Sequence, residues 1–272
     1  MAVMMAHLVA DLSAETEDLL QMVAPLEASA WDLPTPAEGW TIRDQISHLA
    51  YSDDAARLAA TDSEAFRAQA LELITLLGES FPDVIAVRYR DLSALALLEW
   101  FRVARSALVG VFLSLDPRRR LPWYGPDMSA ASSVTARIME TWAHGQDIAD
   151  TLGIERDATQ RLRHIAHLGI QTFAFGFTVH GLEVPEDSVR VELEAPTGAL
   201  WAWGPEDAGD RVIGNALDFC LVVTQRRHLR DTALSISGAT ATRWMSIAQV
   251  FAGAPGGGRK AGQFARTEQR HP

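Results

Sequence analysis

The chain of 272 residues contains one cysteine, Cys220, so no intrachain disulfide can form. A single cysteine neither requires nor supports an oxidising compartment. Cys220 lies in the apolar run 216–223, and a lone cysteine in such a run is usually an inert buried thiol. The sequence therefore excludes a disulfide-stabilised chain and a zinc or redox site built on paired cysteines.

Long apolar segments are also lacking. The longest, residues 168–179, is interrupted by Gln171 and is shorter than the roughly 20 residues that a bilayer-spanning helix needs. Residues 1–20 have no basic segment followed by an apolar core, which argues against a signal peptide. We therefore expect a cytoplasmic protein without membrane contact.

An excess of positive charge is absent, because 24 Lys and Arg residues face 35 Asp and Glu residues and give a net charge of −11. This balance argues against a nucleic-acid-binding surface and suits an enzyme. The Gly-Lys-Ser/Thr phosphate loop, the Gly-x-Ser-x-Gly nucleophile elbow and the Gly-x-Gly-x-x-Gly dinucleotide motif are absent as well. The sequence therefore gives no sign of the enzyme chemistries that these three motifs serve.

Hydrophobic residues make up 48% of the chain, which is enough for the core of one large or two modest domains. Apolar residues at helical spacing predict helices over most of the first two-thirds. Thr41, with Asp44 three residues later, is typical of a capping box that opens a helix. The predicted helices cover residues 6–26, a segment from 41 onward, 63–77, 91–115, 131–152 and 157–177.

The pattern changes after residue 181. Residues 189–194 alternate strictly between apolar and polar, which predicts a strand with one solvated face. Further strands are predicted at 200–203, 211–213 and 233–237, and helices at 216–225 and 240–251. Helices followed by mixed elements indicate the α+β class. We predict a helical bundle over residues 1–182, a small C-terminal α/β domain over 183–254 and a disordered tail over 255–272.

Three side chains form a candidate metal site. Glu140 and His144 are four residues apart, so they share one face of the predicted helix 131–152, next to its apolar stripe. Together with His48 they would supply three good ligands for a divalent ion such as zinc and leave one coordination position open, as in catalytic sites. Spacing does not itself bring His48 to the pair. The alternatives are a solvated Glu–His pair and a buried, hydrogen-bonded histidine.

Three acidic residues lie near these candidates. Asp147 follows His144 on the same helix face and could orient it by accepting a hydrogen bond, or could be a surface carboxylate. Asp53 and Asp54 follow His48, and we interpret them as solvated rather than ligating.

Arg226 and Arg227 belong to a basic cluster, residues 225–230, in an otherwise acidic chain. Such arginines could hold a carboxylate of a substrate or of a thiol cofactor through bidentate hydrogen bonds. The alternative is a solvated helix end that the helix dipole favours.

Two segments, residues 40–49 and 140–148, resemble in order and spacing the motifs of the mycothiol-dependent maleylpyruvate isomerase family, within the DinB-like superfamily of metal-binding helical bundles. The resemblance covers about residues 5–180. It implies a DinB-like up-down bundle in which His48, Glu140 and His144 bind a divalent metal, usually zinc. It also implies a small C-terminal α/β domain with an arginine that serves the reaction, for which Arg226 and Arg227 are the nearest candidates.

The resemblance therefore implies a metal-dependent isomerase or thiol transferase that acts on a small organic substrate with a zinc-bound low-molecular-weight thiol, mycothiol. Arg226, Arg227 and Asp147 are its candidate catalytic residues. The alternatives are a thiol-independent metal enzyme, such as a hydrolase, cyclase or lyase, and a non-catalytic protein that binds a metal or small ligand. We expect a monomer or homodimer that binds no nucleic acid.

Overall fold

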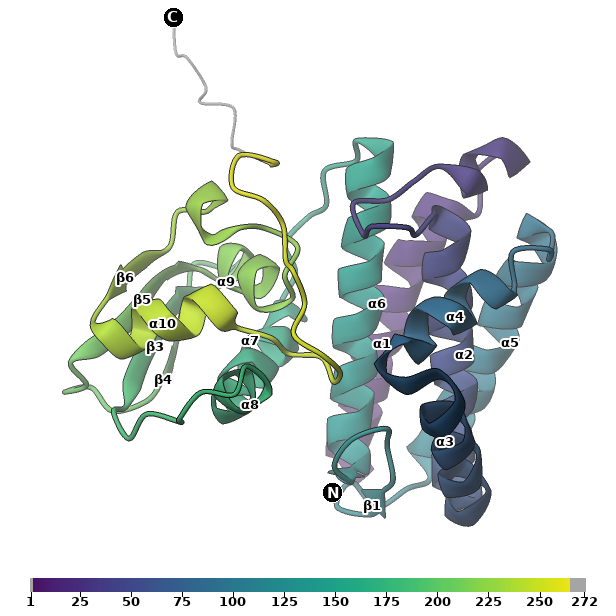
Figure 1. Cartoon of the computed structure of the whole chain (residues 1–272), viewed down its shortest axis with the longest axis horizontal. Helices are drawn as coiled ribbons and strands as arrows, with labels where there is room; N and C mark the ends of the chain where they lie inside the picture. The colour runs from purple at the N-terminus through teal and green to yellow at the C-terminus, as the bar shows by residue number, and fades with distance from the viewer. Residues whose placement is uncertain (1, 265–272) are drawn as a thin grey trace, which may run out of the picture. The chain divides into compact units, whose positions relative to one another are not determined.

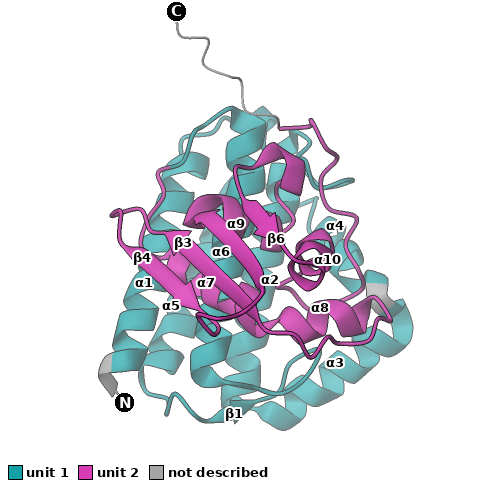
Figure 2. Cartoon of the chain, turned by 90° about the vertical axis from the view of Figure 1, so that its left-hand side faces the viewer, with its two compact units in different colours: residues 1–156 teal, residues 157–272 magenta. Residues whose placement is uncertain are grey.

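The chain divides into two compact units, Met1–Arg156 and Asp157–Pro272, and the computed structural model describes residues 2–264 (Figure 2). Unit 1 is helical and unit 2 combines helices with a small sheet, so the predicted α+β class is confirmed. None of the helices in the described part of the chain is long and apolar enough to cross a membrane.

Four long helices form the bundle of unit 1 (Figure 1). They are α1 (Ala2–Val23), α2 (Ile42–Thr61), α5 (Ala94–Leu113) and α6 (Ala130–Leu152). One core cluster joins the late parts of α1 and α6 to the early parts of α2 and α5, and a second cluster joins the opposite ends. The first includes Val23, Ile42, Leu97 and Ile148, and the second includes Val9, Ala60, Phe112 and Val134. The helices α2 and α6 are therefore antiparallel.

The chain returns between α2 and α5 through α3 (Ser63–Leu77), the short 3₁₀ turn η2 (Gly78–Ser80) and α4 (Phe81–Arg88). This return is why α5 runs parallel to α2 in the bundle. The sequence did not predict α4, whose first turn contains a proline. A second 3₁₀ turn, η1 (Ala28–Asp32), precedes α2, and a two-stranded ladder of β1 (Arg120–Leu121) and β2 (Met128–Ser129) precedes α6.

Local sequence signals set the ends of the two helices that carry the candidate ligands. The capping box of Thr41 and Asp44 opens α2, as predicted. The Ser129 hydroxyl accepts a hydrogen bond from the Ser132 N–H at the start of α6, and Gly153 ends α6 in the left-handed conformation, with φ of 65°. The helix predicted over 131–152 begins one residue earlier than predicted, and its predicted end is confirmed.

Unit 2 contains a sheet in the order β4-β3-β5-β6 (Figure 1). Its strands are β3 (Val189–Glu194), β4 (Leu200–Trp203), β5 (Asp210–Asn215) and β6 (Ser235–Ser237). The pair β3–β5 is parallel, and β4 and β6 are antiparallel to their neighbours. Val191 faces Trp203 and Val212 in register, and Val191, Leu193 and Val212 are buried, so the predicted alternation of this strand is confirmed.

In the described part of unit 2, four helices and one 3₁₀ turn accompany the sheet. They are α7 (Leu162–Gln171), α8 (Phe173–Val179), α9 (Ala216–Val223), η3 (Leu229–Asp231) and α10 (Ala239–Ile247). The single helix predicted over 157–177 is wrong, because the backbone breaks at Thr172, whose hydroxyl donates to the carbonyl of Leu168. The last helix also ends earlier than the predicted residue 251.

A close approach of helices explains why α7 belongs to unit 2. A Cβ atom at Gly169 would lie 3.0 Å from the Phe219 ring and 3.1 Å from Val223, so the missing side chain lets α7 pack directly against α9. The compact units thus differ from the predicted domains in residues 157–182. The predicted domain boundaries stay predictions.

The segment predicted as a disordered tail begins at residue 255. Its described part, 255–264, has no helix or strand. The Gly256 N–H donates to Gln249 Oε1 over 3.1 Å, and the Gly262 N–H donates to Asp231 Oδ1 over 2.7 Å. The rest of the predicted tail, 265–272, lies outside the described residues.

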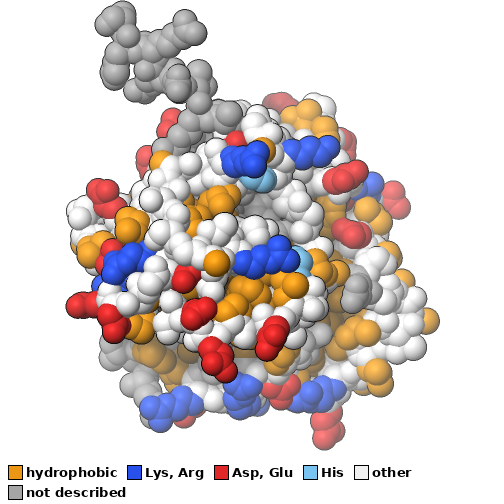
Figure 3. All heavy atoms as spheres, turned by 60° about the vertical axis from the view of Figure 1, so that its left-hand side comes forward, with side chains coloured by type: hydrophobic (Ala, Val, Ile, Leu, Met, Phe, Trp, Pro, Cys, Tyr) orange, Lys and Arg blue, Asp and Glu red, His pale blue; other side chains and the backbone are white. Residues whose placement is uncertain are grey.

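On the face drawn in Figure 3, basic side chains occur in small separate groups with acidic side chains between them.

Cys220 is fully buried on α9, and its Sγ lies 3.4 Å from the carbonyl oxygen of Leu162. Burial raises the pKa of this thiol far above its usual range. We therefore expect no reaction of the native protein with a thiol reagent at about pH 8, because the thiolate is the reactive form. Denatured protein should react once per chain. Rapid labelling of the native protein would contradict the inert role.

Candidate metal centre

The three candidate ligands converge, although they come from distant parts of the chain. His48 lies on α2, Glu140 and His144 lie on α6, and one potential ligand atom of each is within 4.8 Å of the others. Glu140 Oε2 is 3.1 Å from His144 Nε2 and 3.5 Å from His48 Nε2. Two ligand atoms of a tetrahedral zinc ion, each bonded at about 2.0–2.1 Å, lie about 3.3 Å apart. The donor types and their separations therefore fit a zinc-like divalent ion.

The carboxylate of Glu140 is held in its charged form. Its side chain is only 16% exposed, and burial by itself raises the pKa of a carboxyl group. The hydrogen bonds with His144 and His48 and the nearby charge of Arg137 outweigh burial and hold the pKa of Glu140 well below its usual range. The group is thus a carboxylate at neutral pH, which is the form that binds a metal.

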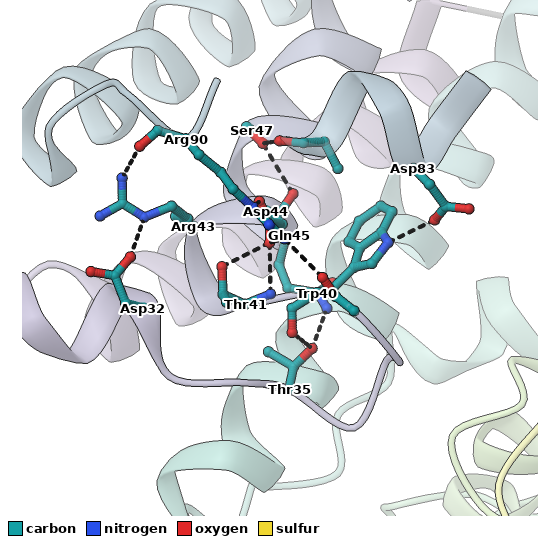
Figure 4. A network of polar contacts seen from close by, with 12 residues as sticks. Asp32, Thr35, Trp40, Thr41, Arg43, Asp44, Gln45, Ser47, Asp83 and Arg90 are labelled. Carbon is teal, nitrogen blue, oxygen red and sulfur yellow. Dashed lines mark hydrogen bonds and ion pairs between the residues drawn. The ribbon is translucent and has the colours of Figure 1, made fainter. Parts of the chain in front are cut away.

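Gln45 fixes the orientation of His144. Its amide nitrogen donates to the Thr35 hydroxyl over 2.8 Å, and that hydroxyl donates in turn to the carbonyl of Trp40 (Figure 4). The amide oxygen of Gln45 is thereby left to face His144 Nδ1 at hydrogen-bonding distance. Since an amide oxygen only accepts, Nδ1 of His144 carries a proton, and Nε2, which faces Glu140, would ligate a metal ion once it has given up its own proton.

Trp40 covers the two imidazole rings. Its ring is stacked on His144 at a centroid distance of 5.7 Å and an interplanar angle of 15°, and it is tilted against His48 at 5.3 Å. The indole N–H donates to Asp83 Oδ1 on α4 over 2.7 Å. This bond ties the position of Trp40 to α4, the returning helix that the sequence did not predict.

A polar network holds the loop that carries Trp40 to the start of α2 (Figure 4). The fully buried carboxylate of Asp44 accepts from the backbone and hydroxyl of Thr41, each over 2.8 Å. Arg90 donates to both oxygens of Asp44, over 2.6 and 2.9 Å, and to the carbonyl of Gly39. Arg43 donates in turn to the carbonyl of Arg90. Gln45 and Trp40 are therefore placed by a rigid support.

We predict that Gln45→Leu lowers the zinc affinity of the cluster by about 10- to 100-fold, the usual cost of losing a hydrogen-bond partner of a ligating histidine. Gln45→Glu is the matched control, because it keeps an acceptor oxygen at the same position. Competition with a chromophoric chelator measures both variants. Equal affinities for Gln45→Leu and the wild type would contradict the orienting role.

The other predicted site residues lie in different surroundings. Asp147 is on α6, one turn beyond His144, and is fully buried, so the interpretation of this residue as a surface carboxylate is wrong. Its predicted role as the orienting acceptor of His144 stays a prediction, and the acceptor that the described contacts show at Nδ1 is Gln45.

Arg226 and Arg227 follow α9 in unit 2 and are half-buried. Arg226 donates to the carbonyl of Thr224, and the guanidinium of Arg227 lies 4.0 Å from the centre of the Phe264 ring. Arg227 also lines a cavity of about 420 Å³ together with His180, His228 and Arg230. Their catalytic role stays a prediction.

Sequence reasoning missed the roles of Trp40 and Gln45, although both lie in the segment that carries His48. It also missed Arg137, which lies one turn before Glu140 on α6 and acts electrostatically on it. Arg137 could have been recognised from the sequence, because it lies three residues before Glu140 and so shares the helix face of Glu140, His144 and Asp147.

Similarity to known proteins supports the same family. A family model described as the mycothiol maleylpyruvate isomerase N-terminal domain matches residues 12–149. A model described as wyosine base formation matches residues 185–235. Uncharacterized proteins from two strains of Mycobacterium tuberculosis, CDC 1551 and H37Rv, are each 49% identical over 254 residues, which cover 92% of this chain and 97% of theirs.

The fold is similar to that of two crystal structures of the mycothiol-dependent maleylpyruvate isomerase. A histidine-to-alanine mutant of that enzyme matches with a TM-score of 0.59, and another structure of the enzyme matches with a TM-score of 0.57. Each comparison covers 87% of this chain and 93% of the other at 14% identity. At this identity the likeness shows the fold alone.

Proposed function

The chain belongs to the mycothiol-dependent maleylpyruvate isomerase family, and we propose that it is a metal-dependent enzyme that uses a low-molecular-weight thiol, mycothiol, for isomerisation or thiol transfer on a small organic substrate. The observation that carries this proposal is the convergence of His48, Glu140 and His144 on one point. The proposal includes a cytoplasmic location, where thiols are kept reduced.

In this proposal, His48, Glu140 and His144 hold a divalent ion, with zinc expected from the nitrogen and oxygen donors. Such an ion, when bound through three protein ligands, supplies a Lewis acid that lowers the pKa of a thiol or water at its open position. Gln45 keeps His144 in the ligating tautomer, and Trp40 shields both imidazoles from solvent. The protein thus contributes orientation and a sheltered environment.

The reaction class follows from thiol chemistry. A thiolate adds to a double bond that a carbonyl group activates, forms a carbon–sulfur bond and shifts the π electron pair onto the carbonyl oxygen as an enolate, so the former double bond is a single bond that can rotate. Departure of the thiolate then restores the double bond in the other geometry, so the thiol is regenerated. In thiol transfer, the thiolate displaces a leaving group instead, and the carbon–sulfur bond remains in the product.

The test is turnover of maleylpyruvate by purified protein with and without mycothiol, before and after removal of metal by a chelator. We expect turnover that requires mycothiol, disappears with the metal and returns on addition of zinc. Turnover that is independent of the thiol would favour a thiol-independent metal enzyme. Bound metal without turnover of maleylpyruvate or of a panel of thiol acceptors would favour a binding protein.

A further inference from the structure

Arg137 is a buried cation whose hydrogen-bonding capacity is incompletely used. It lies on α6 and is only 4% exposed. Its Nη1 atom is buried and has no hydrogen-bond partner among the described residues. Leaving a buried charged donor unsatisfied costs considerable free energy, so native proteins rarely keep one without a reason.

Arg137 acts electrostatically on Glu140, but no carboxylate among the described residues forms an ion pair with it. Its Cζ atom lies 5.4 Å from the centre of the Trp123 ring, which is a favourable cation–π arrangement. The charge of Arg137 lowers the pKa of Glu140, which lies one turn further along the helix. The Oε2 atom of Glu140, however, is already within hydrogen-bonding reach of His144 and close to His48. The aromatic ring cannot accept the in-plane N–H bonds that an anion accepts.

The hydroxyl group of Tyr124 lies within electrostatic reach of this guanidinium, and that of Tyr51 lies close to it. The positive charge of Arg137 influences Tyr124, whose hydroxyl is 3.4 Å from that of Tyr51. Burial is the main cause of the raised pKa of Tyr124, so its hydroxyl keeps its proton and can donate. A separation of 3.4 Å is long for two hydroxyls, and each has capacity for another partner.

The antiparallel packing of α2 and α6 explains why these groups meet. Tyr51 lies one turn after His48 on α2, and Arg137 lies one turn before Glu140 on α6. Because the helices run in opposite directions, both positions are displaced from the metal ligands toward the same end of the bundle, by about 4.5 Å along the axis. Aromatic rings of Phe66, Phe81 and Trp123 surround Tyr124 at this level.

We propose that Arg137, with the hydroxyls of Tyr51 and Tyr124, binds a carboxylate of the substrate one helical turn from the metal ligands. A carboxylate has the charge and the planar pair of acceptor oxygens that a guanidinium recognises. Because the proposed carboxylate site lies one helical turn from the metal ligands, it fits a small acid whose reactive carbon is only a few bonds from its carboxylate. This inference deepens the proposed function and rests on it for the identity of the reacting group.

The test compares binding of succinate and of its uncharged analogue succinamide by calorimetry, in zinc-loaded and in chelator-treated protein. We expect wild-type protein to prefer succinate in both forms. Arg137→Gln should weaken succinate binding by about 10- to 100-fold, the range for one charge-assisted hydrogen bond, with little effect on succinamide. Tyr124→Phe should weaken succinate binding by a smaller factor.

Arg102→Gln is the matched control, because Arg102 is an exposed arginine on α5 of the same unit and should leave succinate binding unchanged. Circular dichroism and elemental analysis establish that each variant is folded and retains zinc. Succinate affinity within about twofold of wild type in folded Arg137→Gln would overturn the proposal. If that variant does not fold, Arg137→Lys decides, because it keeps the charge but loses the planar fork, and an unchanged affinity would overturn the proposal.

Turnover separates this inference from the proposed function. If wild-type protein turns over maleylpyruvate, Arg137→Gln should raise KM by about 10-fold or more and change kcat less. An unchanged KM would overturn the carboxylate role and leave the proposed function standing. If wild-type protein shows no turnover but binds succinate through Arg137, the proposed function fails and the anion site stands.

Discussion

Substitution of His144 by alanine is expected to remove zinc from the cluster and to abolish thiol-dependent turnover, while the bundle stays folded. The substitution deletes one of three converging candidate ligands, and a loss of more than about 100-fold in metal affinity is expected, since even an outer partner of a ligand contributes 10- to 100-fold. The fold should survive because α6 is anchored by the fully buried side chains of Val134, Ile138 and Ile148. Catalytic metals are also less often the main stabiliser of a fold than structural ones.

Elemental analysis of the purified variant, together with circular dichroism, measures both parts of this expectation. His48→Ala should behave in the same way from the other helix. His7→Ala is the control, because His7 is an exposed histidine on α1 and should leave the metal content unchanged. Full zinc retention by a folded His144→Ala variant would show that the ligand assignment is wrong.

The sequence alone predicted much of the bundle and the identity of the converging side chains. The helical spacing of Glu140 and His144 is a local property, and so is the capping box at Thr41, and both can be recognised without knowledge of the fold. His48 could be joined to the pair only through resemblance to a family, because the direction of α2 relative to α6 depends on tertiary packing. No local signal shows that α3 and α4 carry the chain back before α5 begins.

The residues that support the site were harder to predict for the same reason. Gln45 and Thr35 are ten positions apart, and their hydrogen bond depends on how the loop before α2 folds back over α6. Trp40 is held by Asp83, on a helix that the sequence did not predict. Arg137 is chemically unremarkable in the sequence, and only burial shows that its charge needs a partner. Candidate ligands can thus be recognised in the sequence by their residue type, whereas the residues that support them can be recognised only from the packing of the folded chain.

Asp53 and its neighbour Asp54 show how one position on a helix decides between a buried and a solvated charge. The sequence suggested that Asp53 and Asp54 are both solvated, which is wrong for Asp53, since its side chain is fully buried. Its carboxylate pairs with Arg105 over 2.6 Å. Arg105 also donates to the hydroxyls of Thr16 and Thr141, so one guanidinium links α1, α2, α5 and α6. Asp54, in contrast, is 40% exposed and accepts from the indole of Trp100.

We therefore expect Asp53→Ala to lower the free energy of unfolding by about 3–5 kcal/mol, because it leaves the charge of Arg105 buried without a partner. Asp54→Ala, the neighbouring control, should cost about 1 kcal/mol or less, since its charge is partly solvated. Urea unfolding followed by circular dichroism measures both. The double variant Asp53→Leu with Arg105→Met should be closer to wild type than Asp53→Ala alone, because no buried charge remains. Equal losses for Asp53→Ala and Asp54→Ala would mean that the buried pair does not hold the four helices together.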